Sequence, residues 1–174
     1  MPISRTLSVS VFTTMLGFGI ISPLLPVYAT NIGATGLWLG IIFAGFSVSR
    51  TFSMSIIGRL SDKQSKKRII VFGLLLYTVI SVLYIFASDV YLLTLVRMFH
   101  GLASVMVIPI AMAIVGEISV EGEEGIQMST ISTSRVLGRG FGPLIGGAIY
   151  VAFGMSSVFL VMSGLSVVAF VMVL

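Results

Sequence analysis

Six long runs of apolar residues, separated by short polar segments, dominate the pattern of the chain. The runs are residues 6–28, 37–57, 69–87, 90–115, 126–151 and 157–174. A helix that crosses the hydrocarbon core of a bilayer needs about 20 residues, and the runs are close to that length. Strict alternation of apolar and polar residues, which is typical of membrane β-strands, is missing from them. Because lipid leaves backbone groups no solvent partner, the pattern predicts an all-α membrane protein with six transmembrane helices.

Composition supports this pattern and excludes the common soluble classes. Of the 174 residues, 57% are hydrophobic and only 9% are charged, and Cys is absent. A soluble domain has about 25% charged residues, which cover its surface in water. These fractions exclude a soluble enzyme, a disordered chain and a disulfide-stabilised scaffold. At about 20 residues for each transmembrane helix, the length suffices for six helices but not for twelve.

Basic residues outside the apolar runs lie on one side of the predicted helices. Arg5 directly precedes the first run, and the connection at 58–68 contains five more Lys and Arg residues. The connections on the opposite side contain none; they are residues 31–36, 88–89 and 152–156. Because cytoplasmic loops carry an excess of Lys and Arg, we expect a multi-pass protein of the plasma membrane with both termini in the cytoplasm. The formal net charge of +4 then reflects orientation in the bilayer, and no nucleic-acid partner is expected.

Five ionisable side chains lie inside the apolar runs, and all are basic. They are Arg50, Arg97, His100, Arg135 and Arg139. A charge at the bilayer centre costs about 2.5–3.5 kcal/mol, so these residues are expected to face a wet cavity or a partner group. Snorkelling to the membrane surface is the alternative, but Arg50 lies about 12 Å along the helix from Gly58. Arg97 and His100 are three residues apart and therefore share one helix face.

The apolar runs differ in how many functional residues they contain. The runs at 69–87 and 157–174 have neither charged residues nor Pro, so we expect them at the lipid-facing periphery and the other four in the interior. A Gly followed by Pro recurs in the first and fourth runs, in segments 17–23 and 101–109. This layout indicates two inverted three-helix repeats, which are common in transporters.

The fifth run carries a small residue at every fourth position. These residues are Ser134, Gly138, Gly142 and Gly146. Such a ridge lets another helix approach closely, and simple helix packing is one explanation for it. Pro143 cannot donate a hydrogen bond to the carbonyl of Arg139, so a kink is expected there. The alternative that we favour is a bendable joint that meets a second helical bundle.

The segment at 58–68 resembles the signature loop between the second and third helices of the major facilitator superfamily, which reads G-x-L-[AS]-D-R-x-G-R-[KR]-R. The matching residues are Gly58, Leu60, Ser61, Asp62, Lys67 and Arg68. Lys63 and Lys66 stand where the pattern has Arg. Ser65 replaces the second glycine, so the turn there is expected to be less tight.

Three further segments resemble motifs of the same superfamily, in the expected order. The pattern G-x-x-x-G-P-x-x-G-G, typical of the fifth helix of exporters, is complete in Gly138, Gly142, Pro143, Gly146 and Gly147. The first helix is similar to that of drug-exporting members in Gly17, Gly19, Pro23 and Pro26. Arg97 followed by Gly101 resembles the fourth-helix motif R-x-x-x-G, with His100 at a place where Gln is common.

The resemblance implies that residues 1–174 form the N-terminal six-helix bundle of a twelve-helix transporter that works by alternating access. Besides the lipid bilayer and a small-molecule substrate, the partner would be a second six-helix bundle: the missing C-terminal half, a second copy or another chain. The Asp62 loop is implied to gate the transporter through that bundle, and its carboxylate can also meet a cation such as Arg68. Arg97 is implied to take part in proton coupling, with the proton as coupling ion and neither a metal nor another cofactor.

The acidic residues depart from the pattern of drug–proton antiporters, which commonly place a carboxylate inside the membrane. All six lie in loops or at helix ends: Asp62, Asp89, Glu117, Glu121, Glu123 and Glu124. A carboxylate from the partner bundle, titration of His100 and indirect coupling are open explanations, since histidine titrates nearest neutrality. A hydrogen bond from His100 to a neighbouring helix is the simpler role for that residue. A basic cavity is also compatible with an anionic substrate.

The leading hypothesis is therefore half of a secondary-active, proton-coupled exporter of small apolar or amphipathic molecules, of the kind that confers multidrug resistance. An importer or exporter of a small metabolite, including an anionic one, is an alternative. A non-transporting six-helix structural or regulatory protein is another. A membrane enzyme is not expected, because H-E-x-x-H, G-x-S-x-G and a Cys nucleophile are all absent from the sequence.

Overall fold

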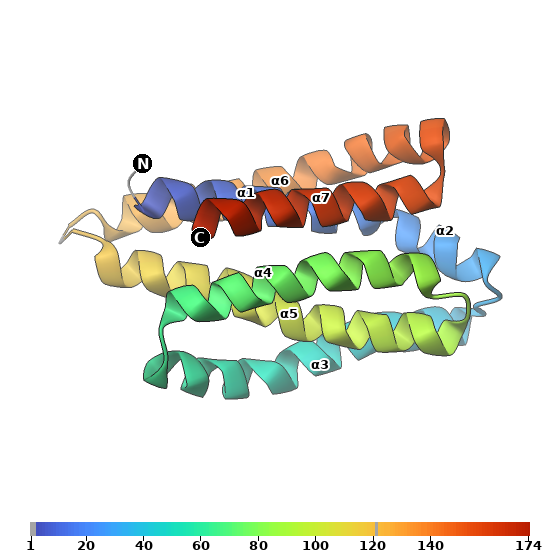
Figure 1. Cartoon of the computed structure of the whole chain (residues 1–174), viewed down its shortest axis with the longest axis horizontal. Coiled ribbons are helices and arrows are strands. Elements are labelled where there is room, and N and C mark those ends of the chain that lie inside the picture. The colour runs from blue at the N-terminus through green and yellow to red at the C-terminus, as the bar shows by residue number, and fades with distance from the viewer. Residues whose placement is uncertain (1–2, 121) are drawn as a thin grey trace.

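The computed structural model describes residues 3–120 and 122–174, and this part of the chain is built from helices without a strand (Figure 1). The elements are α1 (Ile3–Ile21), α2 (Leu24–Asn31), α3 (Gly36–Lys63), α4 (Lys66–Leu83), the short 3-10 helix η1 (Tyr84–Phe86), α5 (Val90–Ile118), α6 (Glu124–Phe153) and α7 (Met155–Val173). Within the described ranges, six helices are long and apolar enough to cross a membrane: α1, α3, α4 with η1, α5, α6 and α7. The predicted all-α membrane fold is confirmed.

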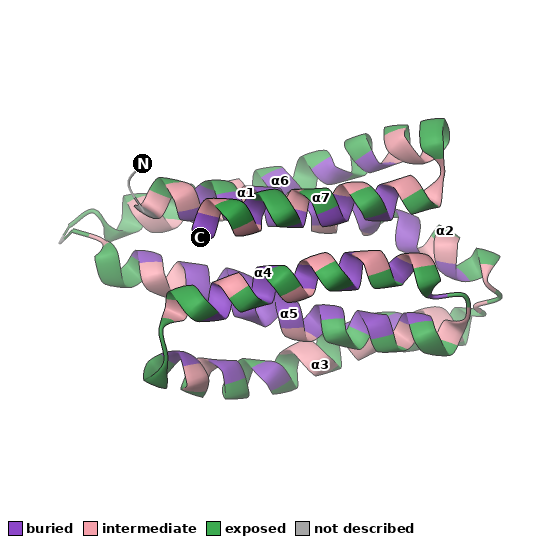
Figure 2. Cartoon of the chain, in the orientation of Figure 1, coloured by how far each residue is buried: buried purple, intermediate pink, exposed green. Residues whose placement is uncertain are grey.

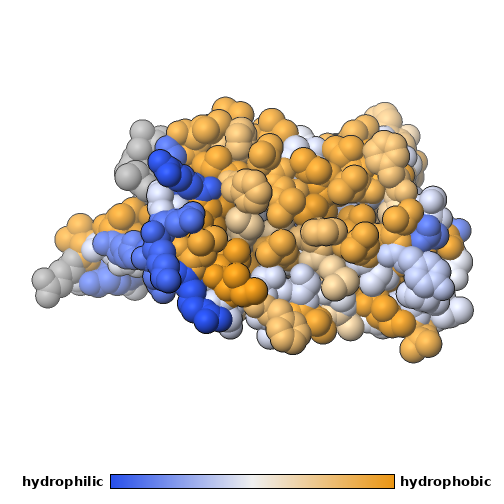
Figure 3. All heavy atoms as spheres, turned by 60° about the horizontal axis from the view of Figure 1, so that its bottom comes forward, coloured by the Kyte–Doolittle hydropathy of each residue, from blue (hydrophilic) through white to orange (hydrophobic). Residues whose placement is uncertain are grey.

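The long helices run alternately in opposite directions along one axis (Figure 1). The start of α1, the end of α7 and the α3–α4 and α5–α6 connections lie at one end, which we call the basic end because of the Lys and Arg side chains of residues 59–68. The opposite end contains α2, the turn at 87–89 and Gly154. Gly154 has a φ of +79°, which suits glycine and allows the abrupt reversal from α6 to α7. Figure 3 shows hydrophilic residues gathered at the basic end and a largely hydrophobic surface over the middle.

The first apolar run is not one continuous helix. The predicted helix at 6–28 is interrupted at Ser22 and Pro23, between α1 and α2. Pro23 has no N–H to donate to the carbonyl of Gly19, so the regular hydrogen-bond ladder cannot pass through it. The other five spans agree with the predicted ranges to within several residues.

The basic connection is mostly helical, which corrects the predicted loop at 58–68. α3 continues to Lys63 and α4 begins at Lys66, so only Gln64 and Ser65 lie between them. Backbone hydrogen bonds of a helix do not require apolar side chains, and no Pro interrupts this segment. The change from apolar to polar residues therefore marks where α3 leaves the apolar layer rather than where the helix ends.

The helices pack in a pattern that repeats within the chain. α1 packs against α6 and α7, while α5 packs against α3 and α4, and α4 contacts α7. If α1 changes places with α5, α3 with α6 and α4 with α7, the same list of contacts results. The exchanged helices run in opposite directions, which is the arrangement expected of two inverted three-helix repeats.

Burial differs among the six spans. In the spanning stretches of α1 and α5, 61% of residues are buried, against only 17% in those of α3 and α6, and α4 and α7 lie in between (Figure 2). Within this bundle alone, 37–57 and 126–151 are therefore less buried than 69–87 and 157–174, and the expected place of the former in the interior of a complete transporter stays a prediction. α3 packs mainly on α5 and α6 mainly on α1, so much of their surface meets no other described helix of this chain.

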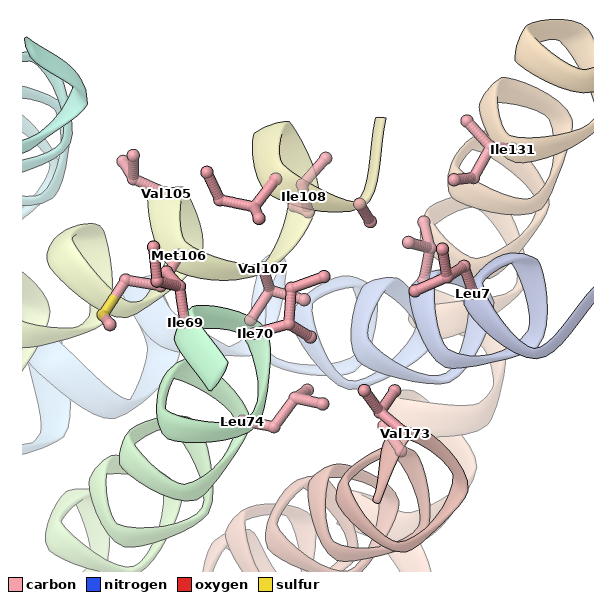
Figure 4. Close-up of a cluster of buried hydrophobic side chains, with 14 of the residues drawn as sticks. Leu7, Ile69, Ile70, Leu74, Val105, Met106, Val107, Ile108, Ile131 and Val173 are labelled. Atoms are coloured by element: carbon pink, nitrogen blue, oxygen red, sulfur yellow. The ribbon is translucent and has the colours of Figure 1, made fainter. Parts of the chain in front are cut away.

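Two clusters of buried hydrophobic side chains hold the helices together. The cluster near the basic end includes Leu7, Ile70, Leu74, Val107, Ile131 and Val173, which come from five helices (Figure 4). The other includes Ile20, Tyr77, Tyr84, Phe159 and Met162. Since lipid tails are as apolar as these side chains, close packing rather than the hydrophobic effect stabilises such contacts between membrane helices.

Candidate functional site

Three of the five predicted basic residues line one pocket at mid-length of the bundle. The pocket has a volume of about 330 Å³ and is lined by Arg50 of α3 and by Arg135 and Arg139 of α6. The rest of its lining comes from Met15, Phe18, Phe46, Ser104, Ile108 and Val136. Arg139 lies about 20 Å from either end of α6 at 1.5 Å per residue, so the pocket is near the middle of the membrane layer. The structure thus brings together side chains from α1, α3, α5 and α6.

Arg97 and His100 do not line this pocket. They lie behind Phe18 and Phe46, which form what we call its aromatic wall. The Arg97 side chain is 3% exposed, and His100 is fully buried. The Arg97 guanidinium carbon lies 4.4 Å from the ring centre of Phe46 and 5.5 Å from that of Phe43. Phe46 also lines the pocket, so one ring contacts both the Arg97 guanidinium and the space lined by the three arginines. A cation over an aromatic face is favourable, and more so where water is excluded.

His100 sits in a cage of aromatic rings. The rings of Phe18, Phe46, Tyr77 and Tyr84 all approach it edge-on, with centre-to-centre distances from 4.5 to 5.8 Å. The His100 Nδ1 atom shares a hydrogen bond of 2.8 Å with the Tyr84 hydroxyl of η1. The simpler role considered from the sequence, a hydrogen bond to a neighbouring helical element, is therefore present.

Three buried polar atoms in this region have no hydrogen-bond partner among the described residues. They are Arg97 Nε, His100 Nε2 and Tyr77 Oη. Leaving a buried donor or acceptor unpaired costs about 1–3 kcal/mol, so these three groups do not contribute to the stability of the fold through hydrogen bonds. Their concentration around one histidine favours a functional role for the region behind Phe46.

We expect the Tyr84→Phe variant to be less stable by about 1–3 kcal/mol, because it leaves both ring nitrogens of His100 without a protein partner. Thermal unfolding of purified protein, followed by circular dichroism, measures the change. Tyr91→Phe is the matched control: Tyr91 is exposed, and its hydroxyl makes no hydrogen bond within the described ranges. Equal losses in the two variants would contradict a specific role for the Tyr84–His100 bond.

The glycine ridge of α6 packs against α1, so the predicted joint with a second bundle is wrong for these residues. Gly138, Gly142 and Gly146 are buried, and a Cβ placed on Gly146 would lie 2.6 Å from the carbonyl oxygen of Ile20. A Cβ on Gly19 of α1 would lie 2.6 Å from the carbonyl oxygen of Arg139. Helix packing within the bundle is the correct explanation, because only glycine lets two backbones approach this closely.

The other glycine and proline motif residues have different surroundings. Gly101 of α5 faces the backbone of α3 at Phe46 and Arg50, a contact that the exchange of the two repeats relates to the one between α1 and α6. Gly17 lies beside Met162 of α7. Two motif residues of α6 point away from α1: Pro143 is exposed, and a Cβ on Gly147 would meet no described atom within 4 Å. Pro23 is exposed and Pro26 half-buried at the break after α1.

The signature motif at the basic end spans the α3–α4 connection. Its residues Gly58, Leu60, Asp62 and Lys63 lie on the last turns of α3, and Lys67 and Arg68 lie on the first turn of α4. The Lys66 Nζ atom forms an ion pair of 2.7 Å with Glu117 Oε1, which connects the start of α4 to the end of α5. Asp62 is exposed and pairs with neither Arg68 nor another described cation, so the pair considered within the loop is not formed. Glu121 lies outside the described residues.

Two aromatic residues of the site were missed in the sequence. Phe46 lies four residues before Arg50 and therefore on the same face of α3, so helical spacing alone could have found it. Phe18 could not have been found this way, because α1 carries no ionisable residue near it. Within the described part of the chain, no group of three His, Asp or Glu side chains could hold a metal ion.

Comparison with known families matches residues 7–174 to the Major Facilitator Superfamily. The chain belongs to this superfamily. Members of this superfamily are transporters rather than enzymes, which agrees with the absence of enzyme motifs from the sequence.

Curated superfamily proteins are similar over most of this chain. An uncharacterized MFS-type transporter of Methanocaldococcus jannaschii is 38% identical over 151 residues, which are 87% of this chain and 39% of that protein. The quinolone resistance protein NorA of Staphylococcus aureus is 32% identical over 137 residues, which are 76% of this chain and 35% of that protein. The chain thus spans well under half the length of these superfamily relatives.

Proposed function

We propose that this chain forms the N-terminal bundle of a secondary-active exporter that moves small apolar or amphipathic molecules by alternating access, coupled to protons. The observation that carries the proposal is the mid-membrane pocket with Arg50, Arg135 and Arg139 beside Phe18 and Phe46. Transporters of this architecture bind substrate near the bilayer midplane, between structural repeats. The name of the Staphylococcus aureus relative, a quinolone resistance protein, supports efflux of drug-like molecules.

A second six-helix bundle is proposed as the partner, whether a C-terminal half, a second copy or another chain. α3 and α6 are two of the four helices that line the pocket, and they are the least buried spans of the bundle. A bundle placed against them would cover the pocket and complete a central site. Asp62, Lys63 and Arg68 are exposed at the basic end, where the proposed gating contacts with that bundle would form.

The proposed location is the plasma membrane, with both termini in the cytoplasm. The start of α1 and the end of α7 lie at the basic end together with the Lys and Arg side chains of residues 59–68. Cytoplasmic ends of membrane proteins carry such an excess of positive charge. The bacterial and archaeal origin of the relatives is in keeping with a plasma-membrane location.

Everted membrane vesicles from cells that express the complete gene test the proposal. With the vesicle lumen made acidic, an exporter that exchanges substrate for protons accumulates a quinolone inside the vesicle. We expect accumulation that collapses when nigericin removes the pH gradient and that is absent from vesicles without the protein. Uptake that ignores the gradient would contradict proton coupling. Accumulation only in right-side-out vesicles would indicate an importer, and insertion without flux would indicate a non-transporting protein.

A further inference from the structure

The charge of the mid-membrane pocket is uncompensated by its own lining. Arg50, Arg135 and Arg139 contribute three guanidinium groups, and no carboxylate is among the lining residues. The ion pair found within the described residues, Lys66 with Glu117, lies at the basic end of the bundle.

Three like charges near the middle of a membrane repel each other and are costly to keep away from water. An anion bound among them would relieve both effects. The planar guanidinium fork is well suited to this task, because it can donate two parallel hydrogen bonds to a carboxylate. The pocket therefore favours a ligand with a negative group.

The pocket also offers flat apolar surface directly beside the charges. The Arg139 guanidinium carbon lies 5.4 Å from the ring centre of Phe18, and the rings of Phe18 and Phe46 are 5.7 Å apart and tilted by 41°. Both rings line the pocket, together with Met15 and Ile108. A pocket volume of about 330 Å³ is in the lower range for small-molecule sites.

We infer that the pocket binds an amphipathic organic anion, with an aromatic body against Phe18 and Phe46 and a carboxylate held by Arg50, Arg135 and Arg139. This inference rests on the proposed function, because it names the substrate class of the same site. Carboxylate side chains of a second bundle are the other source of compensating charge. The substrate is the better candidate because the positive charges and the aromatic rings line the same small-molecule-sized space.

The test compares two probes that share one ring system. The full chain is placed in nanodiscs of neutral phosphatidylcholine, and the binding of radiolabelled 2-naphthoate and 2-naphthamide is measured by equilibrium dialysis. The two ligands have nearly the same shape, and only the first is charged. We expect naphthoate to bind at least about tenfold more tightly, as one charge-assisted hydrogen bond would give.

Arginine variants locate the preference. Arg139→Gln and Arg135→Gln should each reduce it to about threefold or less, since each removes one guanidinium from an exposed position that does not support the core. Arg59→Gln is the matched control, because it removes the same charge at the basic end, away from the pocket. Its preference should equal that of the unmodified chain.

Equal affinity for the acid and the amide would overturn the inference, and so would a preference that both pocket variants leave unchanged. Binding of neither probe at millimolar concentration would also overturn it. These outcomes are separate from the vesicle test of transport. A protein that transports in vesicles but binds both probes equally keeps its proposed function, and the compensating carboxylates then belong to a second bundle.

Discussion

Gly142→Leu is expected to prevent stable assembly of the bundle. A Cβ at Gly142 would collide with the backbone of Gly19 and Ile20 on α1, and backbone atoms cannot move aside as the end of a flexible side chain can. Overpacking of a well-packed core costs about 1–3 kcal/mol, and a leucine between two helix backbones should exceed that range. The measurements are the yield of monodisperse protein after detergent extraction and the thermal unfolding midpoint.

Gly140→Leu is the matched control for this variant. Gly140 lies on the same helix two positions away, and a Cβ there would meet no described atom within 4 Å. The control adds the same side chain to the same segment, so any general effect of leucine on insertion or helicity is shared. We expect yield and midpoint close to those of the unmodified chain. Similar losses in both variants would show that the α1–α6 contact is not the cause.

On the proposed function, Arg97→Gln is expected to lower proton-coupled transport by about 100-fold, which corresponds to about 2.7 kcal/mol in the barrier of the rate-limiting step. Arg97 is 3% exposed, its Nε atom has no described partner, and its charge rests on the rings of Phe43 and Phe46. Arg97 forms no ion pair among the described residues, so the cost of burying its charge offsets its contact with the two rings, and we expect the variant to keep its stability. Flux in everted vesicles and the thermal unfolding midpoint of the same variant are the two measurements.

The pair of readouts separates a functional role for Arg97 from a structural one. A lower midpoint together with lost flux would mean that Arg97 supports the fold, and unchanged flux would refute its part in coupling. Arg59→Gln controls for the loss of one positive charge, since Arg59 is exposed on the last turns of α3. Transport by that variant should remain within about twofold of the unmodified protein, as surface charges contribute little.

The arginines show how far the site could be predicted from sequence. The cost of charge in lipid predicts that Arg135 and Arg139 avoid it, and their four-residue spacing places them on one face of a helix. That Arg50 joins them could not be predicted. It depends on how α3 crosses α5, where Gly101 allows close contact with the α3 backbone at Phe46 and Arg50.

The glycine ridge shows the same limit. Regular spacing of Gly138, Gly142 and Gly146 predicts a close helix contact, but the spacing contains no information about which helix makes it. The structure identifies α1, whose Gly19 completes the contact from the other side. The prediction that the ridge meets a second bundle was wrong because a ridge inside a bundle and a ridge between bundles have the same sequence pattern.

Local sequence patterns were enough to predict six membrane helices, to place five of them to within several residues, and to indicate the superfamily. These features are local, because without water each apolar run must satisfy its own backbone hydrogen bonds. The packing of the helices was needed to show that α3 and α6 are the least buried spans of this bundle, that three arginines share a pocket, and that Arg97 and His100 lie behind its aromatic wall. Those features depend on how each helix is rotated and crossed by its neighbours, which contacts between residues distant in sequence determine.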